Sequence, residues 1–262
     1  MARRLLAPPF ALGDASSRHW RKLGMLKILD WLELHPGETW QQRWDSSGAG
    51  DCRPGDWRDR VMSDLDDAGR LRPPDARLHS RLGAGMTQLI GGDVIRPGLP
   101  WLLTTPAPAR LADEMGRVRD PAGMTALAAL REASTTGRHT FDLALERVAA
   151  IMAAKGGPVA AITPGDCVEL LGCCQSVLAA GPRTNPFFYQ LLHAAGAFPT
   201  GAPPTVRMLS ARFAGQLTVE QMIDRYDLAC RPVRDLLVDY LRERQPGIDY
   251  SSLVGMAIGS PR

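Results

Sequence analysis

The stretch that decides the fold runs from Leu217 to Ile258, LTVEQMIDRYDLACRPVRDLLVDYLRERQPGIDYSSLVGMAI. Thr218 and Gln221 have the spacing of a capping box, which predicts a short helix directly after Thr218. A longer helix is expected to begin near Pro232 and to end at Pro246. A third helix begins at the end of the stretch and breaks off after a few residues.

The longer helix carries one apolar stripe at helical spacing, made of Val233, Leu236, Leu237, Tyr240 and Leu241. A pair of helices cannot bury such a stripe alone, so we expect other helices to pack against it. Because the third helix is cut short, we expect the chain to be truncated and part of the stripe to be uncovered.

The rest of the chain also predicts helices. Of its 262 residues, 45% are hydrophobic and 23% are charged, which is enough for the core of one large or two modest domains. Helical spacing recurs throughout, whereas β structure is expected at most once, as a short hairpin at 87–96 turned by Gly91-Gly92. We therefore predict a mainly α protein of irregular helical bundles. No apolar run has the roughly 20 residues of a membrane span.

The break at Asp120-Pro121 suggests two domains, 1–120 and 121–262. The first is rich in tryptophan, and residues 1–15 are expected to form an arm rather than a packed element. Four of the six tryptophans stand at positions 20, 31, 40 and 44. Their helical spacing favours packing in a core over a stacking platform for bases.

Positive charge is concentrated near the N-terminus. The net charge of +3 does not identify a nucleic-acid partner, but residues 1–30 hold six basic against two acidic residues. Arg18, Arg21 and Lys22 share one face of a helix expected at 18–34. Two interpretations remain open for this face, namely contact with phosphates and a solvated helix surface. Further basic candidates are Lys27, the arm residues Arg3 and Arg4, and the weaker pair Arg207 and Arg212.

Signals for catalysis or metal binding are missing from the sequence. The odd number of cysteines and the lack of a signal peptide predict reduced thiols in the cytoplasm. The adjacent Cys173-Cys174 lacks zinc-ligand spacing, and the five histidines form no H-E-x-x-H pattern. A phosphate loop and a G-x-S-x-G elbow are also missing. We predict no metal, no cofactor and no catalytic residue.

Several segments together resemble a known family. They are LLAPPFAL (5–12), SRHWRKLGMLKILDWLELHPGETWQQRW (17–44), DVIRPGLPWLL (93–103), EMGRVRDPAGMTAL (114–127) and ACRPVRDLLVDYLRERQPGIDYSSLVGMAIG (229–259). The chain is similar to the N-terminal, non-catalytic part of long actinobacterial site-specific integrases of the tyrosine recombinase class. The resemblance covers nearly the whole chain in the same order. It implies DNA integration and recombination as the setting, and a truncated helical core-binding domain at 121–262.

In that family a separate catalytic domain supplies a tyrosine nucleophile, assisted by arginines, a lysine and a His-x-x-Arg element. This chain departs from the pattern, because the residues three positions after its histidines are Lys22, Glu38, Leu82, Asp142 and Gly196. Tyr250 also lacks a preceding His-x-x-Arg, so the activity is not carried over.

The expected function is therefore that of an integrase-like protein without strand-transfer activity. It would bind the phosphates of duplex DNA through Arg3, Arg4, Arg18, Arg21, Lys22, Lys27, Arg207 and Arg212. The alternative is a helical protein-interaction module that associates with itself or with a full-length integrase.

Overall fold

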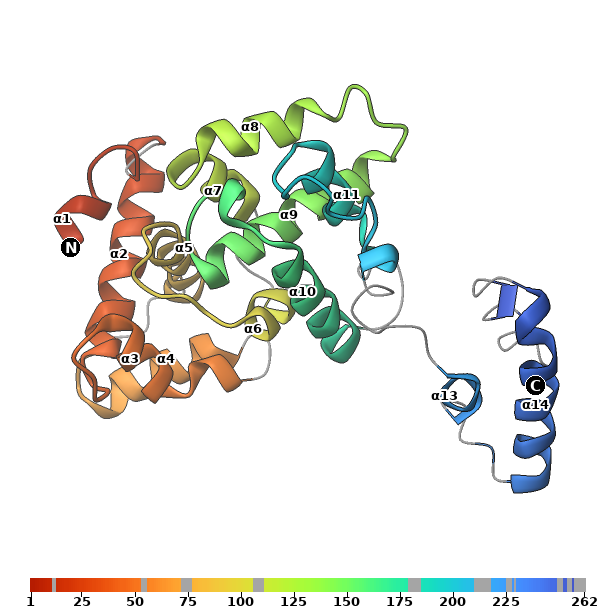
Figure 1. Ribbon diagram of the computed structural model, residues 1–262. Coiled ribbons are helices and arrows are strands. Elements are labelled where there is room, and N and C mark those ends of the chain that lie inside the picture. The colour runs from red at the N-terminus through yellow and green to blue at the C-terminus, as the bar shows by residue number, and fades with distance from the viewer. Residues whose placement is uncertain are drawn as a thin grey trace. The chain divides into compact units, whose positions relative to one another are not determined.

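The structure, a computed structural model, describes residues 1–10, 13–52, 56–71, 77–105, 111–178, 185–209, 218–224, 228, 230–248, 252–253 and 256. The chain forms two compact units, Met1–Val206 and Arg207–Arg262 (Figure 1). The described residues form helices and no strand, which confirms the mainly α prediction. Within them, no helix has both the length and the apolar character needed to cross a membrane.

The first unit begins with α1 (Ala2–Leu5), α2 (Ala15–Leu32), α3 (Trp40–Ser47), the 3-10 turn η1 (Ala49–Asp51), α4 (Asp56–Asp67), α5 (Leu78–Gly91) and α6 (Leu99–Thr104). It continues with α7 (Leu111–Val118), α8 (Pro121–Ala129), α9 (Arg138–Lys155), the turn η2 (Val159–Ala161), α10 (Pro164–Val177) and α11 (Phe187–Ala194). Local signals start several of these helices. Thr39 and Thr163 each form a capping box, and Asp14 caps α2.

Helices α2 and α5 cross with their backbones in contact. A Cβ atom at Gly24 would lie 1.7 Å from the Arg81 carbonyl oxygen, and one at Gly85 would lie 2.2 Å from the Met25 nitrogen. Only glycine allows so close an approach. The hairpin predicted at 87–96 is wrong: residues 87–91 belong to α5, and Gly91, one of the two glycines of the expected turn, is the last residue of that helix.

Tryptophans join α2, α3, α4 and α6 into one core. Trp44 stands edge-on to Trp31 and Trp101, with ring centroids 6.5 and 5.4 Å away, and Trp57 lies 5.9 Å from Trp101. All four side chains are buried. This confirms core packing for Trp31 and Trp44. Trp20 and Trp40 are half-buried beneath the guanidinium groups of Arg81 and Arg43.

The N-terminal segment is packed, which corrects the expectation of an arm at 1–15. Leu5 is fully buried, and its carbonyl accepts a hydrogen bond from Gln88 Nε2 of α5. Arg4 donates to the Gly92 carbonyl just after α5. The side chain of Leu5 fills the space that a Cβ at Gly92 would occupy. Gly92, a glycine of the expected turn, thus leaves room for the N-terminal segment to pack next to α5.

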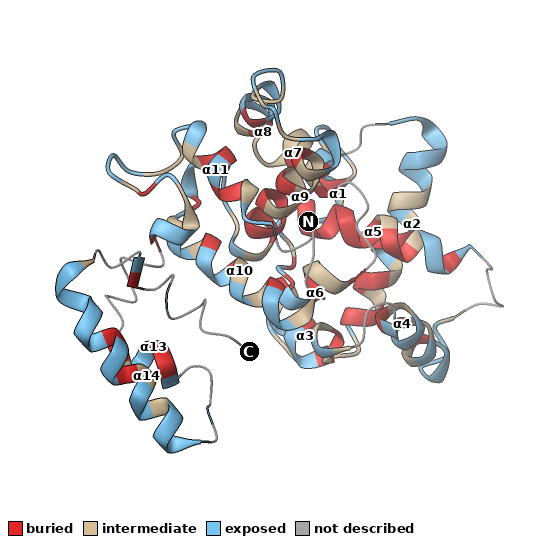
Figure 2. Ribbon diagram, turned by 90° about the vertical axis from the view of Figure 1, so that its right-hand side faces the viewer, coloured by how far each residue is buried: buried red, intermediate tan, exposed pale blue. Residues whose placement is uncertain are grey.

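The first unit continues across the boundary expected at residue 120. Helix α7 packs on α8 and α9, and α6 packs on α9 and α10. Asp120 Oδ1 accepts the Gly123 N–H at 2.8 Å, and its Oδ2 accepts the Val159 N–H at 2.9 Å. Figure 2 shows the buried residues gathered along α5 and α9. The described chain therefore divides after Val206 and not near residue 120.

The second unit contains α13 (Val219–Asp224), α14 (Arg231–Arg244) and the turn η4 (Gln245–Gly247). Thr218 and Gln221 exchange hydrogen bonds of 3.0 and 3.3 Å, as the predicted capping box requires. The core of this unit consists of Val219, Met222, Ile223, Val238, Leu241 and Leu253.

The apolar stripe predicted on the longer helix is only partly covered. Leu241 is buried and Leu237 is half-buried, whereas Val233, Leu236 and Tyr240 are 47, 69 and 44% exposed. The face of α14 that packs against α13 carries Val238 and Leu241. Val233, Leu236 and Tyr240 therefore lie on the side of the helix that points away from this core.

Candidate functional site

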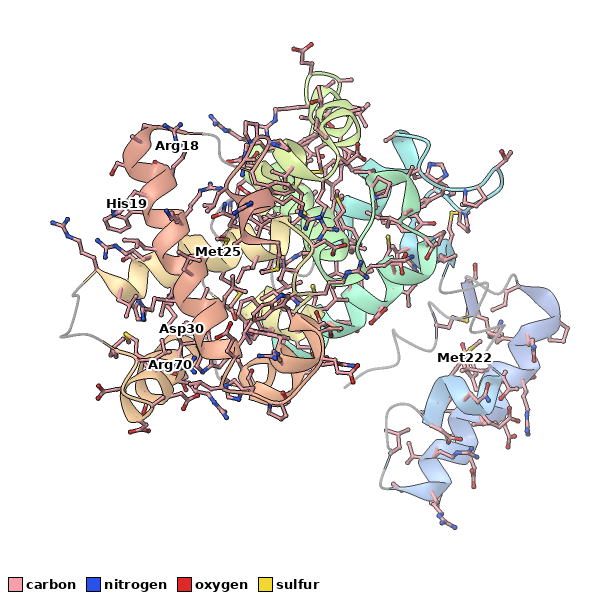
Figure 3. All side chains as sticks on the ribbon, turned by 90° about the vertical axis from the view of Figure 1, so that its left-hand side faces the viewer. Arg18, His19, Met25, Asp30, Arg70 and Met222 are labelled. Carbon is pink, nitrogen blue, oxygen red and sulfur yellow. The ribbon has the colours of Figure 1, made fainter. Side chains whose placement is uncertain are left out.

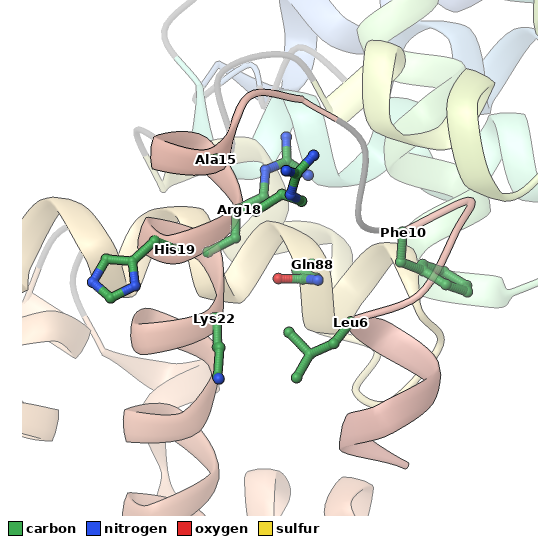
Figure 4. A pocket seen from close by; sticks show the side chains of 8 residues that line it. Leu6, Phe10, Ala15, Arg18, His19, Lys22 and Gln88 are labelled. Carbon is green, nitrogen blue, oxygen red and sulfur yellow. The ribbon is translucent and has the colours of Figure 1, made fainter.

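A cleft of about 340 Å³ lies where the segment after α1 meets the N-terminal half of α2 and the C-terminal part of α5. Leu6, Phe10 and Ala15 supply apolar side chains, and Arg18, His19 and Lys22 supply basic ones (Figure 4). Ala15 stands at the start of α2 beside Arg18, and Gln88 of α5 lies between Phe10 and the basic side chains of α2. The cleft thus has one apolar wall and one positively charged wall.

The cap of α2 sets the positions of the basic side chains. The Asp14 carboxylate accepts the Ser17 N–H at 2.7 Å, and this hydrogen bond is the main cause of a lowered pKa of Asp14. With the helix start fixed, Arg18 and Lys22 stand one turn apart on the same face. Arg18 Nη1 donates to the Gly13 carbonyl at 2.6 Å. Over the described part of the chain, neither Arg18 nor Lys22 has a carboxylate within ion-pair distance.

Arg21 forms an ion pair with a buried carboxylate. Its Nη1 lies 2.9 Å from Glu114 Oε2, and the Glu114 side chain is only 3% exposed. Arg117 pairs with the second oxygen of the same carboxylate and also donates to the Pro9 carbonyl. A buried carboxylate is costly unless cations and hydrogen bonds satisfy it. Arg21 therefore stabilises Glu114, although it also lines the cleft.

Lys27 lies towards the other end of α2 and is also engaged. Its Nζ contacts Asp30 Oδ2 at 3.1 Å and donates to the Arg70 carbonyl at 2.9 Å. Figure 3 shows Arg18 and His19 at one end of α2 and Asp30 beside Arg70 at the other. Lys27 pairs with Asp30, which it shares with Arg70, and it is not part of the cleft.

The remaining predicted cations have different settings. Arg3 is exposed, and the Arg4 guanidinium lies 5.7 Å from the centroid of the Phe10 ring. Arg207 is exposed in a segment where residues 206–209 are helical. Arg212 lies outside the described residues. The structure thus brings Arg18, Lys22 and Arg21 to one cleft and places Arg4 next to its Phe10 wall.

Gln88 is a residue of this cleft that sequence reasoning missed, because it was assigned to the expected hairpin. The residue is only 2% exposed. Its Nε2 donates to Leu5, whereas its Oε1 is shielded from solvent and has no hydrogen-bond partner among the described residues. An available signal was the single amide side chain within the apolar and glycine-rich run GAGMTQLIGG.

The described residues contain no group of three or more His, Cys, Asp or Glu side chains arranged to hold a metal ion. Cys167 and Cys174 are buried in the core, and burial raises the pKa of the Cys167 thiol to about 12. Neither thiol is therefore poised as a nucleophile.

Comparisons of the chain with protein-family models, with curated proteins and with solved structures found no match.

Proposed function

We propose that the first unit binds nucleic acid through phosphate contacts made by Arg18 and Lys22. The supporting observation is that these two cations stand one turn apart at the edge of a cleft, and in the described residues neither has a carboxylate within ion-pair distance, although the charge of Arg18 contributes to the lowered pKa of Asp14. When such cations contact the phosphates of a nucleic acid, they displace the counterions that are condensed on it, and this release favours binding. The sequence resemblance to integrases makes duplex DNA the expected partner. No strand-transfer activity is proposed.

The test compares wild type with the double variant Arg18→Gln/Lys22→Gln by fluorescence anisotropy of a labelled duplex. The plot of log K against log salt concentration has a negative slope, and each lost phosphate contact reduces the magnitude of that slope by about 0.9. The double variant is therefore expected to reduce this magnitude by about 2 and to weaken binding to every sequence.

The control removes two positive charges elsewhere. Arg138→Gln/Arg231→Gln changes the formal charge by the same amount, and both of these arginines are exposed. This variant is expected to bind nearly as wild type does. Equal affinity and equal salt slope for wild type and the Arg18/Lys22 variant would reject the proposal.

A specific observation favours a second candidate, self-association through the exposed part of α14. Val233, Leu236 and Tyr240 lie on one face, and Leu236 alone is 69% exposed. Large apolar side chains grouped in this way are typical of protein interfaces. The expected partner is a second copy of the chain, with the stripes of the two copies in contact.

Sedimentation velocity in the absence of DNA tests this candidate. Wild type is expected to sediment faster with rising protein concentration, and Leu236→Glu is expected to remain monomeric. Asp239→Asn serves as a control, because this carboxylate is 75% exposed on the same helix. A wild-type protein that stays monomeric at every concentration would remove self-association from consideration.

A further inference from the structure

We infer that the first turns of α2 read DNA sequence in the major groove, with the His19 side chain in contact with base edges. The inference deepens the nucleic-acid binding proposed above and rests on it. Phosphate contacts orient a protein on the duplex, but the selection of a sequence requires side chains that reach the bases. His19 can serve this role, because it projects from a face of α2 that Arg18 and Lys22 do not occupy.

The first step of the argument is that the start of α2 is free on every side. Residues 13–19 are all exposed, and Figure 2 shows this end of the helix at the surface of the first unit. Beyond it, the close backbone contact at Gly24 fixes α2 against α5. A helix with its side chains is about 10–12 Å across, and the major groove of DNA is about 12 Å wide. A rigidly supported helix with a free end therefore has the dimensions to enter this groove.

The second step is that a hollow lies on each side of α2. The cleft with Arg18 and Lys22 is one of them. A second hollow, of about 320 Å³, is lined by Ser16, Ser17, Trp20, Arg21 and Ala84. At about 100° per residue, Ser16 and Trp20 stand on the side of the helix opposite those two cations. A helix in the major groove has a sugar-phosphate backbone on each side, and the two hollows give both backbones room. The Ser16 hydroxyl is a neutral donor of the kind that contacts phosphates.

The third step is the position of His19 between these two sides. Its direction differs by about 100° from that of Arg18 and from that of Trp20, so its side chain points outward. Figure 4 shows the His19 ring on the side of α2 that is turned away from Phe10 and Gln88. His19 is exposed and makes no hydrogen bond or ion pair with a described residue. An imidazole donates at least one N–H, and guanine presents two acceptors in the major groove, N7 and O6. Guanine is therefore the base that we expect His19 to select.

The residues around His19 permit this approach to the bases. Ala15, one turn earlier, is exposed and small. Asp14 is the only acidic residue among 13–22, and its carboxylate already accepts the Ser17 N–H. The start of α2 therefore carries more positive than negative charge and has no bulky side chain before His19.

Selection from a library of randomised duplexes by the full chain tests sequence reading. Wild type is expected to enrich a motif with guanine at one fixed position, and to bind it about tenfold more tightly than the same duplex with that base pair changed. His19→Ala is expected to lose this tenfold preference while its salt slope stays that of wild type. His139→Ala is the control, because this histidine is exposed on α9, and it is expected to keep the motif. Since His19 is exposed, we expect its replacement to leave the thermal midpoint unchanged.

Ser16→Ala tests the second hollow. A hydroxyl carries no charge, so its loss is expected to weaken binding to every sequence by about threefold without changing the salt slope or the motif. This combination differs from the result expected for His19→Ala, which changes the motif, and from that for Arg18→Gln/Lys22→Gln, which changes the slope. An affinity equal to that of wild type would overturn the placement of α2 between two backbones.

The outcomes separate this inference from the proposed function. A wild-type protein that enriched no motif would overturn the inference and would indicate binding through phosphates alone. The proposed function would survive that result if Arg18→Gln/Lys22→Gln still reduced the magnitude of the salt slope. A motif that stayed the same in His19→Ala would also overturn the assignment.

Discussion

Glu114 forms an ion pair with Arg21 of α2, which leaves Arg18 as the arginine of this helix face that is available to a ligand. Arg18, Arg21 and Lys22 form one face of the helix, yet only Arg21 reaches the buried acid. Arg21 and Arg117 together neutralise that acid between α2 and α7. A basic helix face therefore contains both structural and available cations, and the difference depends on a residue 93 positions away in sequence.

Replacing Arg21 is expected to affect folding more than binding. Arg21→Gln leaves Glu114 with one cation fewer, so we expect the free energy of unfolding to fall by about 1–3 kcal/mol in urea titrations. DNA affinity of the folded variant should change less than in Arg18→Gln. If Arg21→Gln were as stable as wild type but bound DNA weakly, Arg21 would be a contact residue and not a structural one.

His35 makes stability depend on pH. Burial lowers the pKa of its imidazole, and Asp64, 3.8 Å away, only partly opposes this effect. Below the unfolded pKa of about 6.5, the unfolded chain therefore binds more protons at this position than the folded chain. The contribution of neutral His35 is present above about pH 6.5 and is lost as the pH falls through its folded pKa.

Urea titrations between pH 7.5 and 5 are expected to show wild type losing stability as the pH falls. In His35→Gln this dependence should be weaker, because the variant has no group that titrates there. His139→Gln is the control, since this histidine is exposed. Parallel pH profiles for wild type and His35→Gln would contradict the assignment.

At the scale of the element, local signals predicted most helices but missed α1, α5 and α6. The capping boxes at Thr39, Thr163 and Thr218 are encoded within four residues, so helix starts followed from the sequence. Helix α5 was missed because its glycines usually indicate turns. The role of Gly85 depends on the backbone of α2, which is distant in sequence. The same error concealed Gln88, so the basic side chains of the cleft were predictable from the sequence and Gln88 was not.

The crossing of α2 and α5 predicts a pair of opposite glycine effects. Gly85→Ala places a methyl group 2.2 Å from the Met25 backbone nitrogen, which cannot move as a side-chain tip can. We expect a loss of about 1–3 kcal/mol or failure to fold. Gly172→Ala in α10, with nothing within 4 Å, should instead gain about 0.5–1 kcal/mol. Urea titrations measure both changes, and equal effects would show that α2 and α5 do not cross at Gly85.

At the scale of the whole molecule, the chain divides after Val206 although its sequence suggested residue 120. In the sequence, a proline between two helices of one domain cannot be distinguished from a proline between two domains. Asp120, between α7 and α8, hydrogen-bonds Gly123 of α8 and also Val159 of η2, and the second of these contacts follows only from the fold. Each unit has its own buried core, and the whole cleft belongs to the first.

This division predicts how the two proposed activities separate. A chain ending at Val206 retains every residue of the cleft, so it should keep the thermal midpoint of the first unit and its dependence on Arg18 and Lys22 for DNA binding. It should not self-associate, because Val233, Leu236 and Tyr240 are missing. Calorimetry, anisotropy and sedimentation measure these three properties on the same sample. If the shortened chain folds but no longer binds DNA, the principal contacts lie in the second unit, where Arg207 and Arg212 become the candidates, and the cleft loses its proposed role.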